Sequence, residues 1–206
     1  MSDYPFERHL DHLALARDCA ALGARLRTIE ILTGLSPRTI FCLLRADRRI
    51  PIRGRPPNTP EWYHSGTLLD RSEASIFVSG YRRLRDLGFQ AAPALPGAFR
   101  HYLAVCRSHP RISFDRAFDL ARQLDGIWEV SEPGLALHTC GSCSSRYLTV
   151  VGAASRSGSD CPFCKLKARY FHDPRVQVHF PSAPLPDLSC LEWSLILRTR
   201  LDEQAA

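Results

Sequence analysis

Two closely spaced pairs of cysteines near the end of the chain constrain its fold more than any other feature. CGSC contains Cys140 and Cys143, CPFC contains Cys161 and Cys164, and 17 residues separate the two pairs. Two residues between cysteines allow one tight turn to direct both sulfurs at a single ion, and the Gly and Pro inside the pairs suit such turns. Two turns brought together supply four thiolates in a tetrahedron. The spacing therefore predicts one structural zinc ion per chain, with no open position for catalysis.

The same four thiols have other conceivable uses. Disulfides conflict with the cytoplasmic location that we expect, since residues 1–12 (MSDYPFERHLDH) are polar and contain no secretion signal. A redox dithiol needs one pair at a strand-to-helix junction of a β-α-β unit, and the sequence pattern contains no such unit. An iron centre with the same ligands stays open, because spacing alone does not separate it from zinc. Zinc is the prediction because tetrahedral thiolate sites most often hold it.

The cysteine segment is poor in large apolar side chains. LALHTC and RYLTVV, on either side of CGSC, are short apolar or β-branched runs typical of strands. Between residues 140 and 164 the large apolar residues are Tyr147, Leu148, Val150, Val151 and Phe163. These are too few to fold the segment unaided. We therefore expect metal binding to supply the folding free energy of a small zinc ribbon over residues 135–172.

The rest of the chain has the hydrophobic pattern of helices, so the predicted fold class is mostly α, with a multi-helix domain over residues 1–134. The expected helices in that domain cover residues 7–33, 37–48, 70–88, 96–107 and 113–128. After the ribbon, residues 173–206 are predicted to form a Pro-rich loop and a final helix, which starts with a capping box of Ser189 and Glu192.

The stretch RLRTIEILTGLSPRTIFCLLR indicates a helix-turn-helix-like unit within residues 22–48. Gly34 ends the first helix, Ser36 is a favourable N-cap, and Pro37 suits the first position of the next helix. In DNA-binding units of this type the second helix enters the major groove, and its outward side chains here would include Arg38, Thr39 and Arg45. Helix pairs joined by short turns are common in other proteins too, so DNA binding stays one of two readings.

The charge distribution favours a polyanionic partner. The net charge is +6, and residues 38–55 contain six Arg against one Asp. The cations nearest the cysteines, which we take as further candidates for DNA contact, are Arg146, Arg156, Lys165, Lys167 and Arg169. Four thiolates around Zn²⁺ carry a net charge of −2, so these cations can balance the site and still face phosphate. Solvated helix faces and charge balance alone are the competing explanations.

Other function classes find less support. The sequence contains no evident pair of acid–base carboxylates, no phosphate-binding glycine loop and no nucleophile elbow, so we expect no enzyme. No uncharged apolar run approaches the ~18 residues that a membrane span needs, so we expect no membrane partner. A zinc-stabilised interaction adaptor that never touches DNA stays a rival, and a thiol enzyme is a weaker one.

LGARLRTIEILTGLSPRTI, SEASIFVSGYRRL and the ordered CGSC…CPFC pairs together resemble the FlhC family of flagellar transcriptional regulators, over roughly residues 13–172. The resemblance implies a mostly helical fold and a four-cysteine zinc site at Cys140, Cys143, Cys161 and Cys164. It also implies a hetero-oligomer with FlhD that binds promoter DNA, recruits RNA polymerase and activates flagellar (class 2) operons. NTPEWY and the extension after residue 172 depart from the family pattern, so a divergent regulator of non-flagellar genes is a further alternative.

Overall fold

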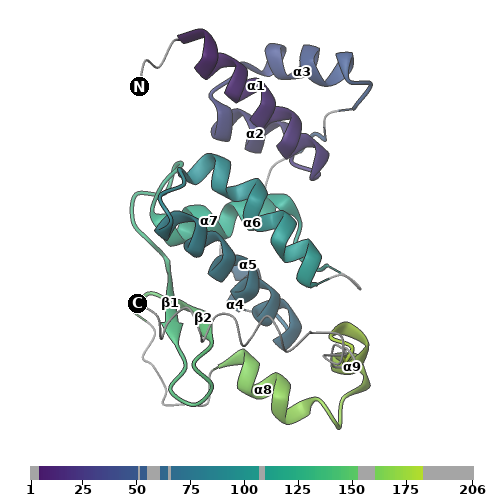
Figure 1. Ribbon diagram of the computed structural model, residues 1–206, viewed down its shortest axis with the longest axis vertical. Helices are drawn as coiled ribbons and strands as arrows, with labels where there is room; N and C mark the ends of the chain where they lie inside the picture. The colour runs from purple at the N-terminus through teal and green to yellow at the C-terminus, as the bar shows by residue number, and fades with distance from the viewer. Residues whose placement is uncertain are drawn as a thin grey trace, which may run out of the picture.

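The computed structural model describes residues 5–50, 52–54, 61–64, 66–106, 110–152 and 161–182. The helices are α1 (Pro5–Ala21), α2 (Leu26–Thr33), α3 (Pro37–Ala46), α4 (Glu61–His64), α5 (Leu68–Asp86), α6 (Ala91–Val105), α7 (Phe114–Asp125), α8 (Pro162–Arg169) and α9 (Pro174–His179), and the strands are β1 (Leu135–Thr139) and β2 (Arg146–Val150). The predicted mostly helical fold is confirmed. The molecule is elongated, with α1–α3 at one end and the β1–β2 hairpin, α8 and α9 at the other (Figure 1).

Helices α1, α2 and α3 pack against one another in pairs, and α2 and α3 form the predicted helix-turn-helix-like unit. Gly34 adopts a left-handed conformation with φ +67°, and its N–H donates to the Glu30 carbonyl, which closes α2. The Ser36 hydroxyl accepts from the Thr39 N–H at 3.2 Å, and Pro37 occupies the first turn of α3. Ile40 and Leu44 are buried. The turn residues therefore act as the sequence predicted.

The prediction of one continuous helix over residues 7–33 is wrong, because α1 ends at Ala21 and α2 begins at Leu26. Gly23 has φ +85°, and the Ala24 N–H donates back to the Cys19 carbonyl, as at many helix C-termini. Arg25 is extended and pairs with Ile52, and its N–H donates to the buried Asp115 of α7 at 3.1 Å. A glycine in the left-handed region and a distant carboxylate thus break a pattern that looks continuous in sequence.

Helices α5, α6 and α7 form the centre of the molecule and contain most of its buried aromatic side chains. Phe77 of α5 is fully buried, and its ring lies against the rings of Tyr81, Phe99 and Tyr102. At the start of α5, Thr67 and Asp70 form a reciprocal capping box, which fixes where the helix begins.

Two predicted boundaries in this centre were wrong. Helix α6 was expected to start at Pro96 but starts at Ala91, so Pro96 lies inside the helix. Pro93 lies in the first turn, where N–H groups have no helical partner, whereas Pro96 lies in the second turn and removes one backbone hydrogen bond from the helix. Helix α7 was expected to reach Trp128, but Gly126 ends it in a left-handed conformation with φ +63°.

The predicted short strands are confirmed as an antiparallel hairpin, with Leu137 opposite Leu148. The hairpin packs on α5 and α7, and Leu135 and Leu148 belong to the same buried cluster as the helical core. The Leu148 N–H donates to Ser75 Oγ at 3.1 Å, and the Tyr63 hydroxyl donates to the Leu148 carbonyl. The hairpin therefore rests on the helices and shares their core. The predicted divisions at residues 134 and 172 stay predictions.

The segment after the last cysteine pair docks back onto α5. His179 of α9 contacts the buried carboxylate of Glu73, which also accepts from the Tyr102 hydroxyl and from the Arg111 N–H. Val176 is buried beside this contact point. The helix predicted from Ser189 onward lies outside the described residues.

Candidate metal centre

The four cysteines that the sequence predicted as ligands converge on one point. The sulfurs of Cys140, Cys143, Cys161 and Cys164 all lie within 4.8 Å of one another. Cys140 Sγ is 3.7 Å from Cys164 Sγ, and Cys143 Sγ is 3.7 Å from Cys161 Sγ. These distances are far longer than the ~2.05 Å of a disulfide bond. A tetrahedron with four Zn–S bonds of ~2.3 Å has sulfur–sulfur edges of about 3.8 Å, which the closest pairs match.

The first pair sits in the turn that joins the two strands. The Ser144 N–H donates to the Cys140 carbonyl at 2.9 Å, and the Cys140 N–H donates to the Ser145 carbonyl at 3.0 Å. Ser144 has φ +59°, a conformation that reverses the chain within four residues. The turn expected for CGSC is therefore present, and it brings both of its sulfurs to one side.

The second pair sits at the start of a helix, which corrects the expectation of a second tight turn. Cys161 is the N-cap of α8 and Pro162 lies in its first turn. Pro162 thus fixes the backbone φ at the start of a helix. Proline suits this position as well as it suits a tight turn. Cys161 and Cys164 are three residues apart and meet on one helical face. Helix α8 was not expected from the sequence, because its basic run, KLKAR, has no obvious apolar stripe.

The environment of the first pair favours thiolates. Backbone N–H groups of Cys143 and Ser142 lower the pKa of Cys140, and hydrogen bonds from Ser145 lower the pKa of Cys143 to about 6. Hydrogen bonds from the protonated Cys164 thiol to Cys143 and Cys140 raise the pKa of Cys164 to about 12. A dication at the centre would take the place of that proton. The four sulfurs, with Cys140 and Cys161 buried, fit a closed tetrahedral metal ion.

Comparison with known proteins assigns the chain to a family. The family model described as "Flagellar transcriptional activator (FlhC)" matches residues 4–176. The chain belongs to the FlhC family. The match spans the helix-turn-helix-like unit, the helical centre and both cysteine pairs, so the resemblance noted from sequence motifs is confirmed.

Curated members of the FlhC family are similar over most of their length. A flagellar transcriptional regulator FlhC from Proteus mirabilis is 27% identical over 175 residues, which cover 82% of this chain and 86% of that protein. The regulator of the same name from Serratia marcescens is 27% identical over 163 residues, which cover 76% of this chain and 79% of that protein. None of the helices among the described residues is long and apolar enough to cross a membrane.

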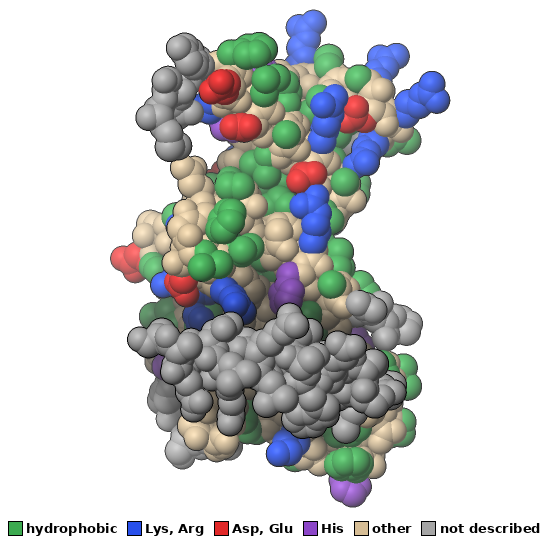
Figure 2. Space-filling view, viewed as in Figure 1, with side chains coloured by type: hydrophobic (Ala, Val, Ile, Leu, Met, Phe, Trp, Pro, Cys, Tyr) green, Lys and Arg blue, Asp and Glu red, His purple; other side chains and the backbone are tan. Residues whose placement is uncertain are grey.

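The structure separates the predicted DNA contacts into two groups. Arg146, Lys165, Lys167 and Arg169 lie at the metal end, on β2 and α8. Arg38, Thr39 and Arg45 lie on α3 at the opposite end, where Figure 2 shows Lys and Arg side chains gathered on the surface. Arg38 and Arg45 are exposed, whereas Thr39 is half-buried and its hydroxyl is 2.8 Å from Ser36 Oγ. Arg156 lies outside the described residues.

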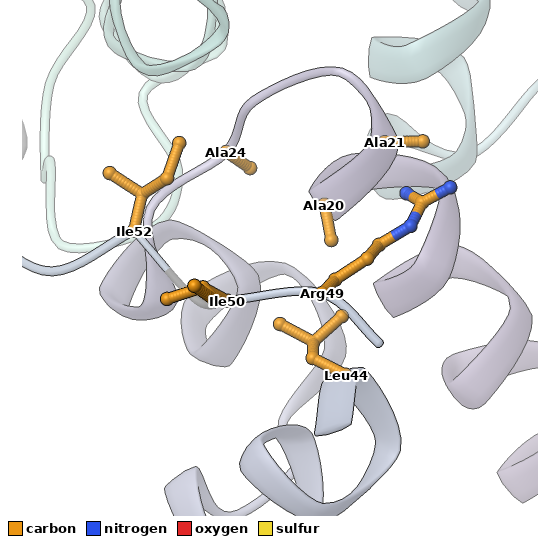
Figure 3. A pocket seen from close by; sticks show the side chains of 7 residues that line it. All are labelled: Ala20, Ala21, Ala24, Leu44, Arg49, Ile50 and Ile52. Atoms are coloured by element: carbon orange, nitrogen blue, oxygen red, sulfur yellow. The ribbon is translucent and has the colours of Figure 1, made fainter. Parts of the chain in front are cut away.

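The end formed by α1–α3 also has a hollow of about 340 Å³ beside the last turn of α3. Figure 3 shows Leu44 and Ile50 among the residues that line it. Three alanines with short side chains, Ala20, Ala21 and Ala24, line it as well. Arg49 is the one cationic side chain that lines it among the described residues, and it extends toward the end of α1. Apart from Arg49, the side chains that line this hollow are all hydrocarbon, so a phosphate would meet one cation there.

Proposed function

We propose that this protein is the DNA-binding subunit of a transcription activator, working in the cytoplasm with an FlhD-like helical subunit. The complex binds promoter DNA and recruits RNA polymerase to flagellar (class 2) operons. The observation that carries the proposal is the FlhC family match over residues 4–176, together with a thiol cluster beside cationic side chains. The chain itself carries out no catalysis.

The metal in this proposal is Zn²⁺, one per chain, held by Cys140, Cys143, Cys161 and Cys164. Four sulfurs leave no position for water, so the ion has a structural role. It joins the hairpin turn to α8 and thereby fixes the cations of both elements on one rigid surface. Iron with four thiolates would have the same geometry, and metal analysis with an absorption spectrum of the purified protein distinguishes the two.

The DNA surface at the metal end is proposed to include Arg146, Lys165, Lys167 and Arg169, and Arg156 from the segment between the cysteine pairs. Lys167 and Arg169 are exposed in the last turn of α8. A second contact is proposed on α3, through Arg38, Thr39 and Arg45. Because the two ends lie far apart along the long axis (Figure 1), a duplex that meets both would have to run along the molecule or bend around it.

The test uses the full chain co-purified with its FlhD-like subunit. The probes are a duplex from the upstream region of a flagellar operon of the same genome and a random duplex of equal length. We expect tighter binding to the upstream duplex, with affinity that falls steeply as salt rises. Equal, non-specific binding to both duplexes at moderate salt would favour the interaction adaptor instead.

Two double variants then locate the surface. Lys165→Ala with Arg169→Ala should weaken binding of the complex without unfolding it, and Arg38→Ala with Arg45→Ala provides the same loss of charge at the other end. If only the α3 pair weakens binding, the contact surface is the helix-turn-helix-like unit. A transcription assay on flagellar and non-flagellar promoters then decides which genes respond.

A further inference from the structure

A second hollow lies against the metal centre and, unlike the one near α3, is lined by more than one cationic side chain. It has a volume of about 520 Å³ and is bounded by α5, α6, the CGSC turn and the start of α8. Its lining residues are Ile76, Ser79, Gly80, Arg83, His101, Val105, Ser144, Ser145, Arg146 and Phe163.

The polar part of this hollow attracts anions. Arg83, His101 and Arg146 come from three different elements, and no carboxylate lines the hollow within the described part of the chain. The Arg83 side chain is exposed and has no carboxylate within ion-pair distance among those residues. Arg146 has Asp86 at 3.9 Å, a long contact between two exposed side chains that a stronger anion can replace.

The apolar part forms a surface against which a ring can lie. Ile76 of α5, Val105 of α6 and Phe163 of α8 line it, and Val105 is 48% exposed although it is a branched apolar residue on a helix. An apolar surface beside a group of cations suits a ligand that joins a charged group to a ring with C–H edges.

The surrounding contacts hold these groups in place. Ser79 Oγ donates to the Arg146 carbonyl at 3.3 Å, which ties α5 to the strand that carries Arg146. Gly80 lets the His101 ring approach α5, because a Cβ at this position would lie 3.2 Å from His101 Cδ2. The cations thus face the hollow from a rigid frame, and the metal centre completes that frame on the side of Ser144 and Ser145.

We infer that this hollow binds one sugar–phosphate unit of the DNA backbone, with the phosphate at Arg83, Arg146 and His101 and the deoxyribose against the apolar surface. Guanidinium groups match phosphate oxygens in pairs, and serine hydroxyls supply further donors. An acidic side chain of a partner protein has only a short methylene stem and would leave the apolar surface uncovered. Lys167 and Arg169 lie further along α8, so the backbone meets cations beyond the hollow as well. The inference rests on the proposed DNA-binding function.

The experiment measures binding of the full-length complex to the two duplexes over a range of salt concentrations. Arg83→Gln should lower the affinity of the complex for both duplexes by roughly tenfold. It should also reduce the slope of log affinity against log salt concentration by about 0.9, as expected for one lost phosphate contact. Arg83→Gln with Arg146→Gln should reduce the slope by about twice as much. Val105→Asp, at an exposed position, should weaken binding further by placing a carboxylate beside the phosphate.

Arg175→Gln is the matched control, because it removes one exposed Arg at the same end of the chain but outside the hollow. Arg83 variants that keep the affinity and slope of this control overturn the inference while the wild-type complex still binds DNA. Loss of the FlhD-like subunit from the Arg83→Gln complex, with DNA affinity per intact complex unchanged, overturns it in favour of an acidic protein ligand. Absence of specific DNA binding by the wild type instead rejects the proposed function. Melting curves show whether Val105→Asp folds. If it does not fold, the affinity and salt slope of Arg83→Gln alone test the inference.

Discussion

The helical centre and the metal end of this protein are stabilised by different means. In α5–α7, Phe77, Phe99, Phe114 and Phe118 are all almost completely buried, so burial of apolar surface supplies the stability. Around the metal centre, Cys143 is exposed and Phe163 is only partly buried. A metal ion held by the four thiolates would supply stability there that burial of apolar surface does not. In the proposed zinc-bound protein, apolar burial therefore stabilises one region and metal binding stabilises the other.

The sharpest way to break this comparison is to remove one ligand. Cys161→Ser should abolish metal binding, reduce the metal content from one ion per chain to none, and unfold α8 with the CGSC turn. The helical centre should keep its cooperative melting transition, because its buried cluster contains no metal ligand. Metal analysis and circular dichroism of the full chain check both statements. Cys42→Ser, at an exposed isolated thiol, is the control and should change neither the metal content nor the circular dichroism. One metal ion and an unchanged melting curve in Cys161→Ser would refute the four-thiolate assignment.

The opposite experiment weakens the helical centre and leaves the ligands intact. Phe77→Ala should lower the free energy of unfolding by about 3–5 kcal/mol, because it removes a fully buried ring that contacts three others. The folded fraction should still bind one metal ion per chain with all four thiols protected from modification. Chemical denaturation followed by thiol titration tests this. Loss of metal from the still-folded protein would mean that the two regions are not separable.

A third variant measures how tightly the two regions are joined. Ser75→Ala removes the acceptor of the buried Leu148 N–H and should cost about 1–3 kcal/mol, mostly by loosening the hairpin from α5. Ser72→Ala is the matched control, since Ser72 Oγ donates within α5, to the Leu68 carbonyl at 2.8 Å. Amide exchange of β2 should therefore accelerate in Ser75→Ala and stay unchanged in Ser72→Ala. Equal exchange in both would show that the metal, and not α5, holds the hairpin.

The convergence of the four cysteines was predictable from the sequence because it depends largely on local spacing. The same holds for the turn at Gly34 and Ser36, where each residue acts on its own backbone. Two predicted helices were extended past glycines near which they end, Gly23 and Gly126, and the first of these breaks also involves a distant group. The break after Ala21 depends on Gly23 together with Asp115, which lies far away in sequence. No local sequence pattern predicts the contact between Arg25 and Asp115.

The sequence also did not predict that Arg83, His101 and Arg146 lie together. Arg83 and His101 belong to helices whose sequences give no sign of a shared site, and only the packing of α5 and α6 against the CGSC turn brings them beside Arg146. The sequence suggested DNA contacts near the cysteines because charge is visible there. It had no means of including residues from α5 and α6, since that requires the tertiary arrangement.

Acid should separate the two regions further, with the smallest of these effects in the helical centre. Partial burial raises the pKa of Asp70, but hydrogen bonds from Arg111 and Thr67 outweigh it and hold the pKa below its ordinary value of 3.8. A carboxyl group with a lowered folded-state pKa stabilises the fold above its unfolded pKa, and this stabilisation is lost as pH falls through the folded value. Asp70→Asn should therefore cost about 1 kcal/mol at pH 7 and nothing below the folded pKa.

Denaturation curves of the two proteins between pH 7 and pH 2 would show this convergence. Asp86→Asn, at an exposed ion pair with Arg82, is the control and should stay within about 0.5 kcal/mol of wild type throughout. The metal end should respond to acid differently, because protons compete with the ion for the thiolates and release it before Asp70 titrates. A single transition in which metal release and helix unfolding coincide at every pH would contradict the division of the molecule into two differently stabilised regions.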